Sequence, residues 1–264
     1  MGKRKKLSSK KFEEKVDRIG RLPDNLIHHI LSFIDVKYAV QASVLSKRWK
    51  DVWVSLPFLS KLTFEIGGDG NPENYEKRAD RFINFVDMVM IFRDDSDIQT
   101  FNLNWHDFAF KDTVIRNVTK WMLMAVKRNV QKLRVEIGDY YDLAFELPHR
   151  LLNCKSLRKL EVISASVVEH RKIILPKSMC LPQLEALALV KLSISGVELE
   201  SLISSCPFLE HLHIFKCDIE ADNQQNLVID SPSLQTFALT NTLRSFRLED
   251  CIVHNITKLS APNL

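Results

Sequence analysis

Apolar and polar residues alternate in short blocks that recur along most of this chain. After residue 58 the blocks share the pattern L-x-x-L-x-L, with valine, isoleucine or phenylalanine at some leucine positions. Five clear copies begin at residues 130, 157, 184, 209 and 234, so they are 27, 27, 25 and 25 residues apart. Two fainter copies begin at Leu59 and Ile98. Because the last three positions alternate, each copy predicts one strand whose apolar side chains face inward.

A fixed period in the twenties predicts how these strands assemble. This core and this period are the signature of leucine-rich repeats, whose units stack into a solenoid. Stacking places the strands in a curved parallel sheet on a concave face. Between the strands, residues 76–92, 112–127 and 197–205 carry apolar residues at helical spacing, and we expect core-forming helices there. A further copy at Leu243 comes only nine residues after its neighbour and predicts an irregular hairpin or a strand within one longer repeat.

Residues 17–53 follow a different pattern, with three short pieces of helical length. Pro23 suits the first turn of a helix, where its missing N–H costs nothing. Asp35 and Ser46 are candidate N-caps of a second and a third helix. About forty residues are close to the lower limit for an independent fold. The region therefore either leaves apolar surface for a partner or packs on the rest of the chain as an ordinary helical subdomain.

Short motifs in this region are shared with a known family. The pieces are Asp17-Arg18-Ile19, Leu22-Pro23-Asp24, Ile30-Leu31-Ser32-Phe33 and Val44-Leu45-Ser46-Lys47-Arg48-Trp49, followed by Trp53. They resemble the F-box of plant F-box/leucine-rich-repeat proteins, and the run S-V-L-S-K-R-W at residues 43–49 is highly specific for that family. One departure is Asp35-Val36, where family members usually carry a proline and a small polar residue. This departure alters a loop and leaves the apolar anchors in place.

The resemblance implies that this chain attaches to a larger machine. The F-box of such proteins docks on the Skp-type adaptor, and through it on the cullin, of an SCF ubiquitin ligase, while the repeats hold a target protein for ubiquitination. Docking residues, or their immediate support, would be Leu22, Pro23, Ile27, Ile30, Leu31, Leu45, Trp49 and Trp53. Two alternatives stay open: a leucine-rich-repeat interaction scaffold without ligase coupling, and a small-molecule-sensing F-box receptor.

Target recognition is expected on the concave strand positions beside the buried leucines, because concave solenoid surfaces commonly bind proteins. These positions include Asn102, Arg134, Glu161, His211, His213 and Arg247. His211 and His213 share a face of one predicted strand, a spacing that ligates zinc only with at least one further ligand. No Cys, His or Asp cluster stands near them, so we expect two surface side chains rather than a metal site.

The sequence offers no motif for bond chemistry. It contains no G-x-S-x-G, H-E-x-x-H, Walker or C-x-x-C pattern, so we expect no catalytic residues, no cofactor and no enzyme. Cys154 and Cys206 each stand three residues before the first leucine of a repeat, and Cys217 and Cys251 hold a second recurring position. Buried cysteine behaves as a small hydrophobe, so this register indicates a structural role rather than a disulfide or metal ligand.

The net charge of +4 is concentrated at the N-terminus, where residues 1–15 hold seven Lys or Arg and two Glu. Basic residues in a tail, rather than along a folded face, argue against nucleic-acid binding. The tail is either a nuclear-localisation patch or a solvated end. No apolar run reaches the length of a membrane span, and the N-terminus lacks the apolar region of a secretory signal. We therefore expect the nucleus, the cytoplasm or both, and no membrane partner.

The sequence as a whole predicts an α+β chain: a small three-helix F-box followed by a short α/β leucine-rich-repeat solenoid. We expect a disordered basic tail over 1–16, the F-box over 17–58, an irregular first repeat and linker over 59–96, and the repeats over 97–264. Residues 260–264 resemble the opening of a repeat at 230–234, so the repeat region is expected to be truncated at its C-terminus.

Overall fold

The computed structural model describes residues 22–32, 60–67, 75–93, 95–106, 111–138, 144–165, 170–220, 227–229, 231–240, 251–253 and 258–260. The chain forms two compact units, Met1–Leu56 and Pro57–Leu264.

The first unit contains helix α1 (Asp24–Ser32). The helix begins directly after Pro23, whose carbonyl oxygen accepts hydrogen bonds from the backbone N–H groups of Leu26 at 3.0 Å and Ile27 at 3.1 Å. Proline suits this position because the first N–H groups of a helix have no intrahelical acceptor. The helix predicted after Pro23 is therefore present. The predicted second and third helices lie outside the described residues.

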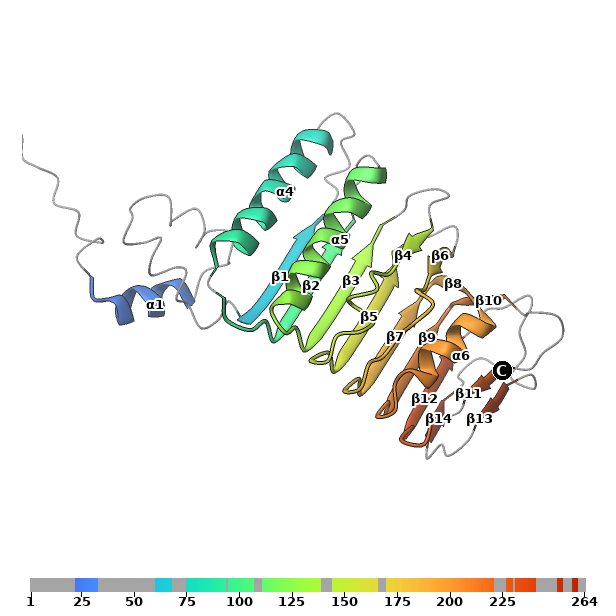
Figure 1. Ribbon diagram of the computed structural model, residues 1–264. Helices are drawn as coiled ribbons and strands as arrows, with labels where there is room; N and C mark the ends of the chain where they lie inside the picture. Colours follow the sequence, from blue (N-terminus) through green and yellow to red (C-terminus); the bar gives the residue numbers. More distant parts are fainter. Residues whose placement is uncertain are drawn as a thin grey trace, which may run out of the picture. The chain divides into compact units, whose positions relative to one another are not determined.

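The second unit is built on one sheet of eight parallel strands (Figure 1). Sequence order and spatial order coincide, so each new strand joins the same edge of the sheet. This is the parallel sheet that the repeat pattern predicts, and with the helices it confirms the α+β class. The strands are β1 (Lys61–Ile66), β2 (Thr100–Trp105), β3 (Lys132–Ile137), β5 (Lys159–Ser164), β7 (Ala186–Val190), β9 (His211–Phe215), β12 (Thr236–Thr240) and β14 (Lys258–Ser260).

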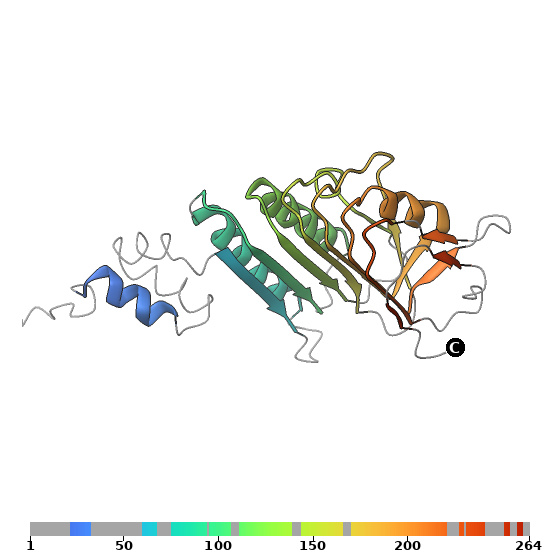
Figure 2. The ribbon, with the colours of Figure 1, turned by 90° about the horizontal axis from the view of Figure 1, so that it is seen from below.

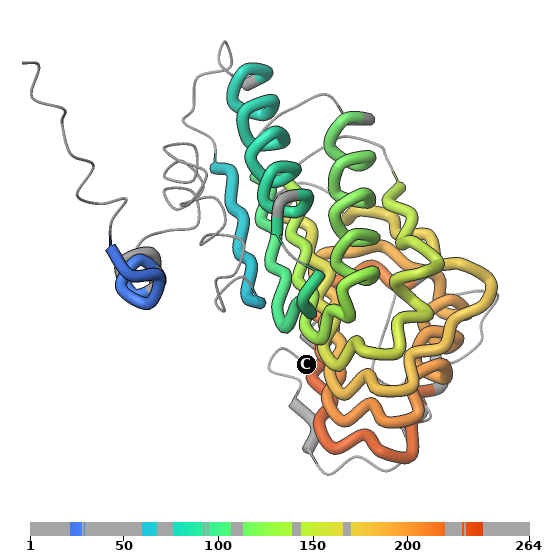
Figure 3. Tube along the Cα trace, turned by 60° about the vertical axis from the view of Figure 1, so that its left-hand side comes forward, coloured from blue at the N-terminus to red at the C-terminus, as the bar shows by residue number. Residues whose placement is uncertain are grey.

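The segments that connect one strand of the sheet to the next are helices in the first repeats and contain short strands in the later ones. Helices α4 (Tyr75–Phe92) and α5 (Lys111–Lys127) make the first two returns and cover the same face of the sheet (Figure 2). Later returns contain short strands that form a second parallel sheet, and Figure 3 shows these repeats as stacked turns. The return strands are β4 (Phe145–Glu146), β6 (Arg171–Ile174), β8 (Leu192–Ser195) and β10 (Asp218–Glu220). Helix α6 (Gly196–Ser204) follows β8, and β11 (Leu227–Ile229) pairs with β13 (Cys251–Val253).

The three predicted helices between strands are all observed, as α4, α5 and α6. The second sheet has no counterpart in the repeat pattern, because its strands are two to four residues long. The predicted hairpin at Leu243 lies outside the described residues. Strand β14 pairs with β12 in parallel, so the sheet gains a strand beyond the last regular copy of the pattern.

The three apolar positions of the repeat form the core. The middle position is continuous across the sheet, because Leu62, Phe101, Leu133 and Leu160 are partners in register on β1, β2, β3 and β5. Burying one such side chain contributes roughly 1.5–3 kcal/mol. Residues at the three positions that are at most 4% exposed are Leu62, Phe64, Ile98, Phe101, Leu103, Val130, Leu133, Val135, Leu157, Leu160, Val162, Leu184, Leu187, Leu189, Leu209, Leu212, Ile214, Leu234, Phe237 and Leu239.

Aromatic side chains join the helices to the first strands of the sheet. Trp105 on β2 and Trp121 on α5 are fully buried and stack with ring centroids 5.9 Å apart. Phe82 on α4 meets both indoles edge-on, at 5.3 Å from Trp105 and 6.0 Å from Trp121. Edge-to-face contacts of this kind add roughly 0.5–1.5 kcal/mol beyond the burial of area. The cluster therefore fixes α4 and α5 on the sheet.

Two lysines make the corners between the sheets. Lys191 stands between β7 and β8 with φ 54°, and Lys216 follows β9 with φ 48°. A residue with positive φ turns the chain sharply, and glycine adopts this conformation at lower cost than other residues. The Lys191 backbone N–H donates to the Phe215 carbonyl oxygen at 2.8 Å, which links one corner to the next repeat.

The four cysteines whose side chains the structure describes are free thiols. Cys154, Cys206 and Cys217 are at most 5% exposed, as a structural role requires, whereas Cys180 is exposed. The Cys206 thiol donates to the Leu202 carbonyl oxygen at 3.1 Å, and the Cys217 thiol donates to that of Leu189 at 3.3 Å. Burial raises the pKa of both thiols to about 11. The side chain of Cys251 lies outside the described residues.

Candidate protein-binding site

The start of helix α1 and the two residues before it carry the described part of the predicted docking surface. Pro23 is exposed, Leu22 is half-buried, and Ile27 is fully buried, so Ile27 supports the surface from within. Leu26, next to Ile27 on α1, is 46% exposed, although the resemblance did not single it out. The side chains of Ile30 and Leu31 and the whole of Leu45, Trp49 and Trp53 lie outside the described residues.

The second candidate surface is the face of the eight-stranded sheet opposite to helices α4 and α5. Strand residues alternate, so every second side chain of each strand lies on this face. The parallel register arranges these side chains in rows that cross the strands. The middle row contains Thr63, Asn102, Arg134, Glu161, Ala188, His213 and Ala238.

Four of the predicted target-binding residues lie in this middle row: Asn102, Arg134, Glu161 and His213. His211 lies in the preceding row, where it pairs with Ala186 on β7. Arg247 lies outside the described residues. The alternation of the sequence therefore predicts one shared surface for five of the six residues.

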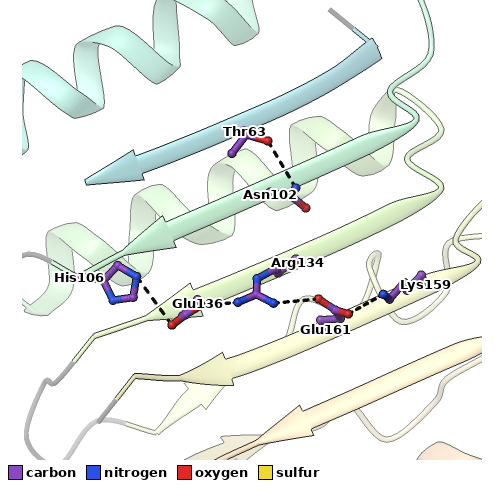
Figure 4. A network of polar contacts seen from close by, with 7 residues as sticks. All are labelled: Thr63, Asn102, His106, Arg134, Glu136, Lys159 and Glu161. Atoms are coloured by element: carbon purple, nitrogen blue, oxygen red, sulfur yellow. Dashed lines mark hydrogen bonds and ion pairs between the residues drawn. The ribbon is translucent and has the colours of Figure 1, made fainter. Parts of the chain in front are cut away.

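Charged side chains on strands β3 and β5 form a connected network (Figure 4). Arg134 extends its guanidinium between two carboxylates, with one nitrogen 2.6 Å from Glu136 Oε2 and the other 3.3 Å from Glu161 Oε2. Lys159 Nζ lies 2.7 Å from the other carboxylate oxygen of Glu161. His106, directly after β2, places Nε2 3.7 Å from Glu136 Oε1.

The network shifts the pKa of two of its members, Glu161 and Arg134. Burial alone would raise the pKa of Glu161, but hydrogen bonds and charges from Lys159 and Arg134 outweigh it and lower that pKa. Burial opposes the charge of Arg134 as well, yet Glu136 and Glu161 together raise its pKa. The positive and negative side chains on β3 and β5 therefore bind one another in fixed positions. Their charges compensate within the network, so this part of the face is preorganised.

Four of the side chains drawn in Figure 4 were not among the predicted residues. Glu136 and Lys159 each stand two positions from a predicted residue of the same strand, so strand alternation alone could have found them. Thr63 was missed because the first copy of the repeat is faint, and it accepts a hydrogen bond from the Asn102 amide at 3.4 Å. His106 lies beyond its strand, where the repeat pattern carries no information.

The described residues contain no group of three or more His, Cys, Asp or Glu side chains that could hold a metal ion. His211 is 54% exposed and places Nε2 3.9 Å from Glu210 Oε2, while the His213 ring contacts the Phe215 ring at 5.9 Å. In the described part of the chain, no helix is long and apolar enough to cross a membrane.

The arrangement agrees with what sequence comparison finds. The F-box domain family matches residues 19–61, and the family of the LRR repeats of FBD-associated F-box protein At5g56370 matches residues 118–264. FBD-associated F-box protein At4g10400 of Arabidopsis thaliana is 32% identical over 246 residues, which cover 89% of this chain and 56% of that protein.

Two further Arabidopsis thaliana relatives give the same result. F-box/FBD/LRR-repeat protein At1g78750 is 30% identical over 258 residues, covering 96% of this chain and 52% of its own length. F-box protein At4g09920 is 32% identical over 226 residues, covering 85% of this chain and 66% of its own length. The chain thus spans roughly half to two thirds of the relatives it matches. With an F-box at its start and a solenoid sheet built from leucine-rich repeats, this chain belongs to the plant family of F-box/leucine-rich-repeat proteins.

Proposed function

We propose that this chain is the substrate-recognition adaptor of an SCF (Skp–cullin–F-box) ubiquitin ligase. The observation that carries the proposal is the pairing of two different surfaces on one chain. The F-box family matches residues 19–61, and within this stretch Pro23, just before helix α1, and Leu26, on α1, are exposed. The second unit presents an open sheet face of eight strands.

The two surfaces have separate tasks in this proposal. The F-box, over residues 17–58, binds the Skp-type adaptor and through it the cullin. The face of the repeats binds a target protein and brings its lysines close to the ubiquitin-loaded enzyme. The mechanism is proximity, because tethering raises the effective concentration of the lysines without any new chemistry. The chain itself supplies no catalytic group and requires no cofactor.

The working compartment is part of the same proposal. The basic residues of the N-terminal tail, over 1–16, suit a nuclear-localisation patch. We propose that the chain acts in the nucleus, the cytoplasm or both.

The docking half is tested by co-purification of the full chain with a Skp-type adaptor. We expect the wild-type chain to retain the adaptor and the double variant Leu22→Ala with Trp49→Ala to lose at least tenfold in affinity, as expected when interface anchors are truncated. Val197→Ala, which removes a 55% exposed apolar side chain on α6, is the matched control and should bind normally. Failure of the wild-type chain to bind would reject ligase coupling.

The rival function is a repeat scaffold that no longer couples to a ligase. Asp35-Val36 favours it, because these residues replace the proline and small polar residue that the family usually carries. Restoring a proline and a serine at these two positions separates the functions. A variant that gains adaptor binding absent from the wild type would support the scaffold, and equal binding by both would support the adaptor.

A further inference from the structure

From β1 to β12, the face of the sheet is divided into two chemically different halves. Outward positions on β1, β2 and β3 are polar or charged throughout: Lys61, Thr63, Glu65, Thr100, Asn102, Asn104, Lys132, Arg134 and Glu136. Outward positions on β7, β9 and β12 carry no Asp, Glu, Lys or Arg: Ala186, Ala188, Val190, His211, His213, Phe215, Thr236, Ala238 and Thr240. Strand β5 forms the boundary, with Lys159 and Glu161 followed by Ile163.

An apolar row lies on the uncharged half at the C-terminal ends of the strands. Ile163, Val190 and Phe215 are partners in register on β5, β7 and β9. All three are half-buried, so each still offers part of its side chain. With about 4.8 Å between neighbouring strands, the row is about 10 Å wide. It is therefore wide enough for one or two apolar side chains of a partner.

The small residues beside this row make it accessible. Ala188 lies before Val190 on β7, between the longer Glu161 on β5 and His213 on β9. A partner backbone can approach closely over alanine, whereas the charged half is filled by the long side chains of the Arg134 network. Interface centres are depleted in charge and enriched in aromatic residues, which fits the uncharged half and not the charged half.

Positive charge borders the apolar row. Lys191 and Lys216 directly follow Val190 and Phe215, and Lys216 Nζ lies 5.3 Å from the centroid of the Phe215 ring. The nearest outward carboxylate in register with Ile163 belongs to Glu136, which Arg134 engages at 2.6 Å. The charge beside the row is therefore positive, and it complements an anionic group of the partner.

We propose that the β5–β9 half of the face binds a segment of the target protein in which an apolar side chain adjoins a carboxylate. The apolar side chain packs on Ile163, Val190 and Phe215, and the carboxylate lies beside Lys216. The inference rests on the proposed function, because it assigns the target-binding role of the sheet face to one half and gives that target a chemistry. In this proposal Phe215 is the central anchor for the apolar side chain, and Lys216 determines that the neighbouring residue of the target is acidic.

The test uses a random 12-residue peptide display library, selected on the full chain with and without added Skp-type adaptor. We expect selected peptides to share an apolar residue next to Asp or Glu. The affinity of the best peptide should fall about tenfold for Phe215→Ala, the loss typical of a central aromatic anchor. Selection on Lys216→Glu should yield Lys or Arg in place of the acid.

Two variants outside the face are matched controls. Phe208→Ala removes a 60% exposed ring in the turn before β9, and Lys77→Glu reverses an exposed charge on α4. Both should keep the peptide affinity within about twofold, because surface substitutions away from a site have small effects. Thermal unfolding of each variant separates loss of binding from loss of fold, and the charge reversal at Lys216 does not depend on Phe215→Ala being stable.

Three results would overturn the inference: no enriched peptide, enriched peptides without an acid, or peptides that bind Phe215→Ala and Lys216→Glu as well as wild type. Adaptor binding on the same samples keeps the two proposals apart. Adaptor binding without an acidic apolar peptide rejects this inference alone. Peptide binding without adaptor binding upholds the inference and rejects ligase coupling.

Discussion

Trp121 donates a hydrogen bond from its indole Nε1 to Asp87 Oδ1 at 2.6 Å, and this bond joins helix α5 to helix α4. The indole is fully buried, whereas Asp87 keeps 28% of its side chain exposed. Lys120 reaches the same carboxylate at 2.7 Å from the more exposed side. The carboxylate thus satisfies a buried donor and a surface cation, and the two helices are held together over the first strands of the sheet.

Trp121→Phe removes this bond while keeping an aromatic ring in the cluster. We expect the free energy of unfolding to fall by roughly 2 kcal/mol, because a hydrogen bond to a charged group and part of a buried ring are lost. Lys120→Ala is the control at the same carboxylate and should cost less than about 1 kcal/mol, as an exposed ion pair does. Urea unfolding measures both, and an equal or larger loss for Lys120→Ala would contradict this account.

Glu161 makes the stability of the sheet face depend on pH. Its pKa in the folded chain is lowered by Lys159 and Arg134, against the effect of burial, from the ordinary value of 4.5. A lowered folded pKa means that the stabilisation is present above the unfolded pKa and is lost as the pH falls through the folded pKa. We expect Glu161→Gln to be less stable than wild type by roughly 1 kcal/mol at pH 7.

The difference between wild type and Glu161→Gln should shrink as the pH falls below about 4.5. Denaturant unfolding at pH 7 and at successively lower pH measures it. Glu185→Gln is the matched control, since Glu185, just before β7, pairs with Arg158 at 2.6 Å but is 45% exposed, and it should give a smaller difference. A difference that persists unchanged into acid would show that Glu161 acts through packing rather than charge.

Burial should protect the core thiols from modification. The pKa of Cys206 and that of Cys217 are raised to about 11 by desolvation, while Cys180 is exposed. The thiolate is the reactive form, so an alkylating reagent at pH 8 should modify Cys180 first. Peptide mass spectrometry follows each cysteine separately. Modification of Cys206 or Cys217 in the folded chain at the rate of Cys180 would contradict the packing described for α6 and β9.

The same thiols give a prediction at high pH. Their pKa is raised above the ordinary value of 9.0, so their contribution is fully present below pH 9 and is lost as the pH rises through about 11. Cys206→Ala should therefore lower stability at pH 8 and flatten its dependence on pH above 9. Phe208→Ala, which removes a 60% exposed ring without a titratable group, should leave that dependence unchanged.

The sheet was predictable from the sequence because its determinants are local and repeated. Each strand carries an apolar side chain at the same position of the repeat, and the pairing of neighbouring strands therefore follows from the repeat period and the alternation. On the first four strands these residues are Leu62, Phe101, Leu133 and Leu160. The shared face of Asn102, Arg134 and Glu161 follows from the same phase. The contact between Arg134 and two carboxylates depends on side-chain conformations, which alternation does not specify.

The second sheet was not predictable from apolar periodicity. Strand β4 holds two residues and β10 holds three, too few to show alternation above chance. The corner before β8 gives no turn signal either, because lysine rather than glycine stands there with φ 54°. Strand β8 pairs with β6 and β10 in the second sheet, and the chain must turn sharply at Lys191 to reach them. This pairing outweighs the preference of lysine for negative φ.

Substitutions at Lys191 therefore measure the free energy that its positive φ costs the folded chain. Glycine adopts φ 54° without strain, which raises the free energy of unfolding, but it also gives the unfolded chain more entropy, which lowers it. Lys191→Gly should therefore raise the free energy of unfolding or leave it unchanged within about 1 kcal/mol. Lys191→Val should lower it by roughly 1–3 kcal/mol, since a β-branched residue is strained at positive φ. Val190→Ala, next in sequence but inside β7, controls for the general cost of change on this strand. If Lys191→Val proved as stable as Lys191→Gly, the corner would not be strained, and the bend would have to come from packing of the two sheets alone.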